Sequence, residues 1–212
     1  MKLADKKKYV LRVIELLENE YGEVAVALDL KKPYELLFAT ILSAQCTDER
    51  VNKVTSVLFK KYKTLNDYAF AGITEFENDI RPTGFFRNKA KNIINSAKII
   101  LEKHGGKVPG EMDKLLMLPG VARKTANIVL GGAFGKFEGL AVDTHVIRIA
   151  NLLKLTKHED PVKIERDLME IVPRKNWKNF SLLIQTLGRR NCKARRPVHE
   201  GCPLMEICPS LK

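Results

Sequence analysis

The sequence predicts an all-α protein. Apolar residues recur at helical spacing along almost the whole chain of 212 residues. No stretch shows the alternation of apolar and polar residues that is typical of a half-buried strand. Residues that cap, start or stop helices separate the periodic segments. Because 45% of the residues are apolar, the chain can bury a substantial core, in one sizeable domain or two small ones.

The first part of the chain predicts five helices. The apolar face of the first contains Val10, Val13, Ile14, Leu17 and Tyr21, and that of the second, after Pro33, contains Tyr34, Leu37, Phe38, Ile41 and Leu42. Thr47 is expected to cap the third. Thr64 with Asp67, and Thr74 with Glu77, have capping-box spacing and predict two short helices.

The middle of the chain predicts three helices around a Pro-Gly turn. The last short helix should stop before Pro82, and the loop PTGFFRNK (82–89) precedes a long helix that runs to Gly105. A short helix around 112–117 leads into the turn. The next should start at about Ala122 and end near GGAFG (131–135).

Three more helices are predicted after GKFEGLA (135–141), a looser stretch that is the best candidate for a domain boundary. One starts at Asp143, one has Asp160 as its cap and Pro161 in its first turn, and one runs from about Trp177 to Gly188. The cysteine-containing tail is too short and too rich in proline for another helix.

The charge predicts a nucleic-acid partner. Lys and Arg number 37 against 25 Asp and Glu, which gives a net charge of +12. Such an excess indicates a polyanion or a membrane surface, and the chain has no amphipathic basic anchor. Its apolar runs fall far short of the ~20 residues of a membrane span. The N-terminus lacks the apolar core and cleavage site of a signal peptide, so we expect an intracellular protein without membrane association.

The turn in LPGVARKTANIVLGG (118–132) is a candidate phosphate site. Gly120 can adopt positive φ, and the helix that follows presents free backbone N–H groups and the positive end of its dipole. An LPG turn alone is a weak signal, because ordinary αα-hairpins often contain one. Arg123, Lys124 and the net charge favour DNA phosphate as the ligand.

Lys124 has two possible uses. It can bind phosphate as a solvated lysine, or its amine can attack a sugar carbon and form a Schiff base. A free lysine titrates near ~10.4 and is mostly protonated at neutral pH. The helix N-terminus and Arg123 both disfavour the ammonium form, which would favour the second use.

Asp143, in LAVDTHVIRIA (140–150), is expected to be a helix N-cap. The same hydrogen bonds would keep its carboxylate ionised and oriented, so it could also stabilise the oxocarbenium ion that develops when a glycosidic bond breaks. Thr144 and His145 are its candidate neighbours. His145 is expected to be a structural hydrogen-bonding residue rather than a direct catalyst.

The tail CKARRPVHEGCPLMEIC (192–208) has the spacing of a metal site. Three Cys and one His most often bind structural zinc, and a cubane iron–sulfur cluster, which usually takes four thiolates, is the competitor. Cys46 lies far away in a helical stretch and is expected to be a small buried residue. The candidate ligands are Cys192, His199, Cys202 and Cys208, and the basic residues suited to phosphate are Lys193, Arg195 and Arg196.

Together these motifs closely resemble those of the endonuclease III family, the bifunctional DNA glycosylases and AP lyases of the helix-hairpin-helix superfamily. The resemblance covers nearly the whole chain. It is carried by LSAQCTDERVNK (42–53), GFFRNKAKNI (84–93), LPGVARKTAN (118–127), VDTHVIR (142–148) and the tail motif. It implies a six-helix barrel domain with the hairpin (26–137) and an iron–sulfur cluster domain built from both chain ends (1–25 and 138–212), with DNA bound across the cleft.

The resemblance also implies roles for individual residues. Lys124 is the implied Schiff-base nucleophile and Asp143 the implied catalytic carboxylate. Gln45 and Phe85 fall where the family inserts side chains into the space left by the flipped nucleotide; a core aromatic is the alternative for Phe85, and a polar residue at a helix end is the alternative for Gln45. The other implied DNA contacts are Gly120, Ala122, Arg123, Lys193, Arg195 and Arg196.

The chain departs from the family pattern at two positions. His199 stands where the family has a cysteine, so the expected cofactor is a [4Fe–4S] cluster with Cys3His ligation; zinc, or a labile or incomplete cluster, is the alternative. Ala122 stands where the hairpin usually has glycine, and its methyl group should crowd the phosphate only slightly.

The expected function is base excision repair of damaged double-stranded DNA. The enzyme should remove oxidised pyrimidines through a lysine Schiff base and cleave the 3′ side by β-elimination. We expect a monomer in the cytoplasm of a prokaryote, associated with the nucleoid. The alternatives are a monofunctional mismatch or adenine glycosylase of the same superfamily, against which Lys124 argues, and a non-catalytic DNA-binding module.

Overall fold

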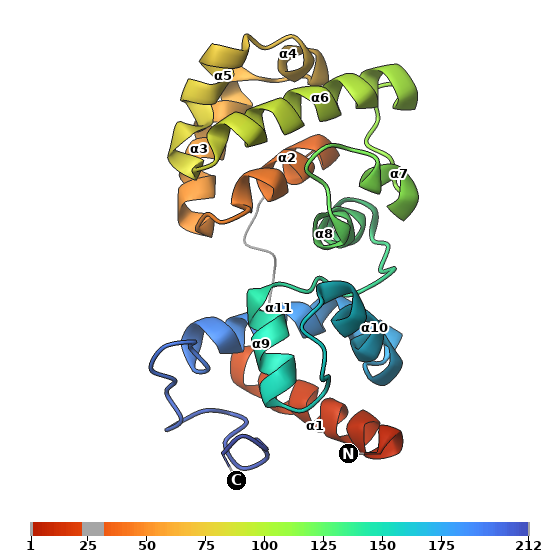
Figure 1. Ribbon diagram of the computed structural model, residues 1–212, viewed down its shortest axis with the longest axis vertical. Helices are drawn as coiled ribbons and strands as arrows, with labels where there is room; N and C mark the ends of the chain where they lie inside the picture. The colour runs from red at the N-terminus through yellow and green to blue at the C-terminus, as the bar shows by residue number, and fades with distance from the viewer. Residues whose placement is uncertain (1, 23–31, 212) are drawn as a thin grey trace. The chain divides into compact units, whose positions relative to one another are not determined.

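The structure, a computed structural model, describes residues 2–22 and 32–211. All regular elements in these ranges are helices, as predicted. They form two compact units: unit 1, from Met1–Val26 and Phe137–Lys212, and unit 2, from Ala27–Lys136 (Figure 1). The domain boundary expected at residues 25–26 lies outside the described residues. Among the helices described, none has the length and apolar character needed to cross a bilayer.

Unit 2 is built around α2. Its elements are α2 (Pro33–Ser43), α3 (Asp48–Lys61), α4 (Leu65–Ala69), α5 (Ile73–Ile80), the 3₁₀ helix η1 (Arg81–Thr83), α6 (Phe86–His104), α7 (Met112–Leu116) and α8 (Arg123–Phe134). Every residue of α2 from Glu35 to Leu42 is buried, because α3, α6 and α8 all pack against this helix (Figure 1). A helix that is buried on all sides is a core helix, and α2 positions the segments that follow it.

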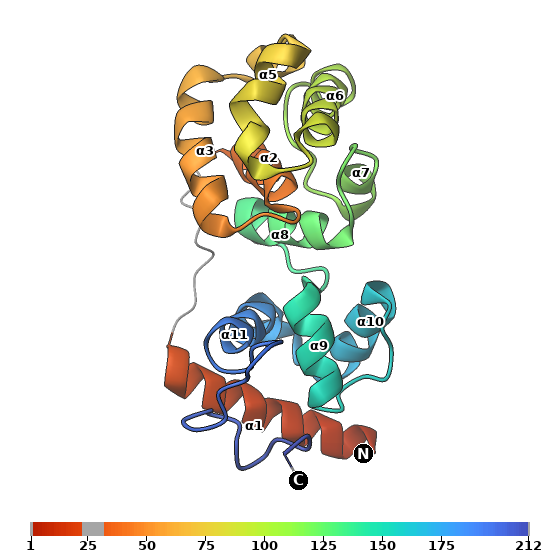
Figure 2. The ribbon, with the colours of Figure 1, turned by 60° about the vertical axis from the view of Figure 1, so that its left-hand side comes forward.

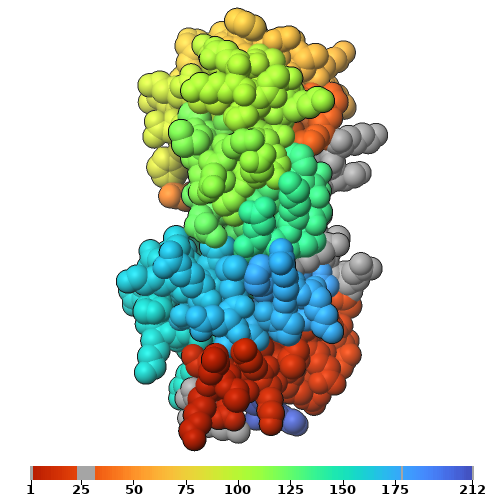
Figure 3. Space-filling model, turned by 90° about the vertical axis from the view of Figure 1, so that its right-hand side faces the viewer, coloured from red at the N-terminus to blue at the C-terminus, as the bar shows by residue number. Residues whose placement is uncertain are grey.

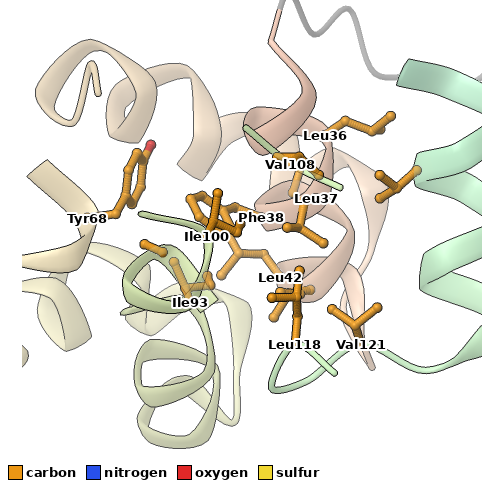
Figure 4. Close-up of a cluster of buried hydrophobic side chains, with 14 of the residues drawn as sticks. Leu36, Leu37, Phe38, Leu42, Tyr68, Ile93, Ile100, Val108, Leu118 and Val121 are labelled. Atoms are coloured by element: carbon orange, nitrogen blue, oxygen red, sulfur yellow. The ribbon is translucent and has the colours of Figure 1, made fainter. Parts of the chain in front are cut away.

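The core of unit 2 anchors the Pro-Gly turn. Leu118 and Val121, on either side of the turn, are buried with Leu37 and Leu42 of α2 in one apolar cluster (Figure 4). Phe38, directly after Leu37 in α2, packs against Tyr68, with ring centroids 4.8 Å apart. The buried side chains of Leu118 and Val121 therefore fix the turn to the core, and the backbone between them lies at the surface.

Most predicted helix starts in unit 2 are confirmed. Thr47 caps α3 by accepting the Arg50 N–H, and Thr64 with Asp67 forms the predicted capping box. The capping box predicted at Thr74 and Glu77 is wrong. Gly72 is the N-cap of α5, so Thr74 lies inside the helix.

The long helix α6 begins earlier than predicted. The sequence predicts a loop over 82–89, but α6 starts at Phe86 and thus includes its last four residues. Phe85, directly before it, has left-handed backbone angles (φ 47°, ψ 27°). The connection from η1 to α6 therefore consists of Gly84 and Phe85, both with positive φ.

Unit 1 combines segments from both ends of the chain. It contains α1 (Leu3–Tyr21), α9 (Thr144–Leu152), α10 (Pro161–Ile171), the 3₁₀ helix η2 (Arg174–Asn176) and α11 (Trp177–Arg190). α1 packs against α10 and α11, and α9 packs against α11 (Figure 2). Asp160 caps α10 as predicted, by accepting the Lys163 N–H, and α11 runs two residues beyond its predicted end at Gly188.

The tail of unit 1 is tied to α1. The Tyr9 hydroxyl donates to the Ile207 carbonyl at 3.2 Å, and the Tyr21 hydroxyl donates to Asn191 Oδ1 at 2.8 Å. Over its described residues the tail forms turns and no helix, as predicted. Leu204 is its only side chain in the buried class among those described, and it joins the unit 1 core.

Candidate active site and metal centre

The Pro-Gly turn has the geometry expected of a phosphate site. Gly120 has φ 78°, and a Cβ at this position would stand 2.7 Å from Asn92 Nδ2. Glycine is therefore required both by the backbone angle and by the close approach of α6. The Ser96 hydroxyl of α6 donates to the Pro119 carbonyl at 3.0 Å and fixes the same turn.

The start of α8 is open. Ala122 is its N-cap, and no side chain among the described residues caps this end. The first turn of α8 therefore presents backbone N–H groups at the positive end of the helix dipole, where an anion can bind. Arg123 and Lys124 are the first two residues of α8, and Lys124 is exposed. On the face shown in Figure 3, α6, α7 and α8 all reach the surface of unit 2.

Gln45 and Phe85 are the tips of two loops of unit 2. Both side chains are exposed, Phe85 by 64%. Both have positive φ, 53° and 47°, which is strained for residues other than glycine. The exposure of Phe85 excludes the alternative that it is a core aromatic. Cys46, next to Gln45, is only half-buried at the edge of the core, so the prediction that it is buried is wrong.

Sequence reasoning missed three residues on α6: Lys89, Asn92 and Ser96. They lie three and four positions apart and therefore share one face of the helix. Lys89 is 4% exposed, and its Nζ donates to the carbonyls of Leu42 and Thr83, each at 2.8 Å. The signal that could have found them is their spacing relative to the buried Ile93 and Ile100, which places them on the apolar face.

Asp143 is the N-cap of α9, as predicted. Its Oδ1 accepts the Val146 N–H at 2.9 Å, and the side chain is half-buried. The carboxylate is thus oriented by the helix that it caps. Thr144 is exposed and His145 half-buried, with the imidazole of His145 lying against Gly188 of α11.

The tail brings its three cysteines into one neighbourhood. All three are half-buried, unoxidised thiols. Burial raises the pKa of Cys202, a backbone hydrogen bond from Leu204 lowers it in part, and the Cys192 and Cys208 thiols raise it further. Arg148 Nη1 donates to Cys192 Sγ at 3.4 Å and links α9 to the tail.

His199 is exposed. Within the described ranges, no three His, Cys, Asp or Glu side chains stand close enough together to hold a metal ion, so the fourfold ligand set remains a prediction. The basic residues between Cys192 and His199 are all exposed: Lys193, Arg195 and Arg196.

Comparison with known proteins gives the family. Residues 38–174 match the model of the HhH-GPD superfamily of base excision DNA repair proteins, and residues 192–208 match the iron–sulfur binding domain of endonuclease III. The endonuclease III of Synechocystis sp. is 51% identical over 209 residues, which cover 99% of this chain and 95% of that protein. The chain belongs to the endonuclease III family.

Solved endonuclease III structures have the same fold. A non-covalent endonuclease III–DNA complex matches with a TM-score of 0.91 and 40% identity, over 96% of this chain and 95% of that one. A trapped covalent endonuclease III–DNA intermediate matches with the same score and identity, over 96% of both chains. The predicted helix-hairpin-helix glycosylase fold is confirmed. As a member of the endonuclease III family, the chain is a DNA-binding base-excision-repair enzyme, a glycosylase with AP lyase activity, and residues 192–208 form an iron–sulfur binding domain.

Proposed function

We propose that Lys124 is the nucleophile of this enzyme and that Asp143 assists release of an oxidised pyrimidine from double-stranded DNA. The observation that carries the proposal is the exposed Lys124 at the uncapped start of α8. Phosphates bound by the backbone N–H groups at the start of that helix would bring a deoxyribose within reach of the amine. Asp143 supports the second role, because its hydrogen bond from Val146 fixes the direction of an anion.

The chemistry proceeds through an imine. The neutral Nζ of Lys124 attacks C1′ of the flipped nucleotide, and the C1′–N bond breaks, with its electron pair and then a proton passing to the departing base. Opening of the C1′–O4′ bond gives a protonated imine, and O4′ takes a proton. Loss of a C2′ proton then expels the 3′ phosphate, and hydrolysis of the imine returns the free lysine. The Asp143 carboxylate stabilises positive charge on the sugar during the first step.

Other side chains hold the DNA. Gln45 and Phe85 fill the space left by the flipped nucleotide, because an aromatic wedge offsets part of the unstacking free energy. The remaining contacts go to phosphate and are made by Gly120, Ala122, Arg123, Lys193, Arg195 and Arg196. In this proposal residues 26–137 are the barrel domain, and residues 1–25 and 138–212 the cluster domain.

The test is reduction with borohydride during reaction with a duplex that contains thymine glycol. The wild-type chain should become covalently linked to the DNA, and Lys124→Gln should not. Lys60→Gln, which removes the same charge from another exposed lysine of unit 2, should form as much adduct as the wild type. Equal adduct formation by the Lys124 variant would assign the nucleophile elsewhere, and no adduct with the wild type would point to a monofunctional glycosylase or a non-catalytic binding module.

We further propose that the tail holds a [4Fe–4S] cluster through Cys192, His199, Cys202 and Cys208. The chemistry of the donor set supports this, since a cubane needs four ligands and the tail supplies three thiols and one imidazole. When bound, the cluster would cross-link the tail and hold its basic loop in shape. The absorption spectrum together with iron and zinc analysis distinguishes this cofactor from zinc and from an incomplete cluster. His199→Cys should slow the loss of cluster absorbance in air.

Bacterial relatives such as the endonuclease III of Bacillus subtilis, 46% identical over 203 residues, support a prokaryotic enzyme. We propose that it acts as a monomer on the nucleoid in the cytoplasm, without membrane association. Sedimentation of the DNA complex would test the monomer.

A further inference from the structure

The side chain of Lys89 is hydrogen-bonded close to the base of two strained loops of unit 2. Gln45 follows α2, and Phe85 precedes α6; both have positive φ. Strained backbone of this kind persists only where the surrounding structure fixes it. Leu42 is in the last turn of α2, one residue before the helix ends at Ser43, and Thr83 is the last residue of η1, two residues before Phe85. The carbonyls of Leu42 and Thr83 are the two acceptors of Lys89.

Lys89 is an unusual choice for a core position. It is 4% exposed, and burial lowers the pKa of its amine, although the neighbouring Cys46 opposes this in part. A buried ammonium group destabilises a fold unless its protons are paired. A leucine or methionine would fill the same volume without that penalty, but neither could donate to two carbonyls at once.

We infer that Lys89 is a positioning residue that holds the Gln45 and Phe85 tips at a fixed separation, so that both enter the DNA together. The inference rests on the proposed insertion of these two tips. Its physical basis is that the space left by one flipped nucleotide is small, so a tip displaced by about an ångström loses much of its effect on the reaction.

Two other residues on the same face of α6 contact the Pro-Gly turn. Ser96 donates to the Pro119 carbonyl, and Asn92 lies against Gly120. One face of α6 therefore contacts the roots of both tip loops and the Pro-Gly turn. Lys89 differs from the other two residues because it alone joins two separate loops.

The experiment compares two substrates. Lys89→Met keeps the length of the side chain and removes its donors. On a duplex with thymine glycol, where the base must be flipped, single-turnover base release should fall by about tenfold or more, with a smaller change in DNA affinity. On a single strand with a preformed abasic site, where nothing has to be unstacked, the lyase rate should stay within about twofold of wild type.

A double-mutant cycle separates positioning from stability. If Lys89 acts through the tips, Lys89→Met should change base release by less than about twofold in a chain that already carries Gln45→Ala and Phe85→Ala. Lys6→Met is the control. It also removes a hydrogen bond from a lysine to a backbone carbonyl, that of Leu155, but in unit 1. It should leave base release unchanged.

The outcomes are distinct. Equal loss on both substrates, or independent effects in the cycle, would overturn the inference and leave Lys89 as a structural residue. If the double tip variant loses no activity, the proposed role of the tips fails and the inference fails with it; the borohydride adduct still tests Lys124 separately. Should Lys89→Met fold poorly, Lys89→Gln keeps one donor group, and the same difference between substrates is required of it.

Discussion

Gly188 of α11 lies directly against the imidazole of His145 on α9. A Cβ at position 188 would come within 3.0 Å of His145 Cγ, closer than packed side chains allow. His145 is the second residue of the helix that Asp143 caps. The absence of a side chain at 188 therefore sets the position of the helix end that carries the candidate catalytic carboxylate.

Gly188→Ala should consequently lower both stability and base release. Overpacking of this kind destabilises by about 1–3 kcal/mol, which corresponds to a fall in Tm of roughly 2–4 °C per kcal/mol at this chain length. Thermal unfolding and single-turnover assays measure the two effects. Gly72→Ala is the control, since its Cβ would meet only Glu75 at 4.0 Å; equal effects of the two substitutions would contradict the explanation.

Asp143 and Asp160 form a matched pair. Each is the N-cap of a unit 1 helix, and each accepts one backbone N–H at 2.9 Å. Asparagine caps helices about as well as aspartate, so Asp143→Asn and Asp160→Asn should change Tm equally little. Only Asp143→Asn should slow base release, by about a hundredfold or more, because it removes a fixed charge. Full activity of Asp143→Asn would show that Asp143 serves only as a helix N-cap and has no role in base release.

Phe85→Asn should make the protein more stable and less active. Asparagine adopts left-handed backbone angles more readily than phenylalanine, so relief of strain at φ 47° should contribute up to about 1 kcal/mol. Loss of the aromatic wedge should slow release of thymine glycol from a duplex. Phe70→Ala, a change at another aromatic that is 80% exposed, should not slow it. Unchanged stability in Phe85→Asn would show that the conformation carries no strain.

Tyr62 should make the protein sensitive to high pH. Burial, followed by the hydrogen bond to the Asp79 carboxylate, raises the pKa of Tyr62 to about 12. A raised pKa stabilises the fold fully below the ordinary value near 10, and this contribution is lost as the pH rises through 12. The contribution is at most about 3 kcal/mol, since each tenfold change in proton affinity corresponds to about 1.4 kcal/mol. Urea unfolding of wild type and Tyr62→Phe should show their difference in free energy shrinking from pH 10 to 12; a constant difference would exclude this cause.

Local sequence signals predicted most of the helices and failed where two signals competed. Thr64 and Thr74 are each followed by an acidic residue three positions later, but only Thr64 caps its helix. Gly72 is the N-cap of α5, two residues before Thr74. Capping-box spacing alone does not reveal which of several nearby residues is the N-cap. The candidate site residues could be predicted from local motifs because their chemistry depends on residue type and on nearby positions, and their roles stay predictions.

The role of Lys89 could not be predicted, although its helical spacing places it on the apolar face of α6. From the sequence it is one basic residue in a basic segment, where a solvated side chain is the normal expectation. Its role depends on two carbonyls, at Leu42 and Thr83, that the folded chain brings to one point. Likewise, the positive φ of Gln45 and Phe85 is imposed by packing, because neither residue favours it.

The link between Tyr9 and Ile207, 198 positions apart, has a consequence for biosynthesis. Unit 2 is one continuous stretch, whereas α1 is made before unit 2 and its packing partners α10 and α11 are made after it. The cysteines of the tail are made later still. The segment that matches the iron–sulfur binding domain therefore closes over a helix that was made before unit 2.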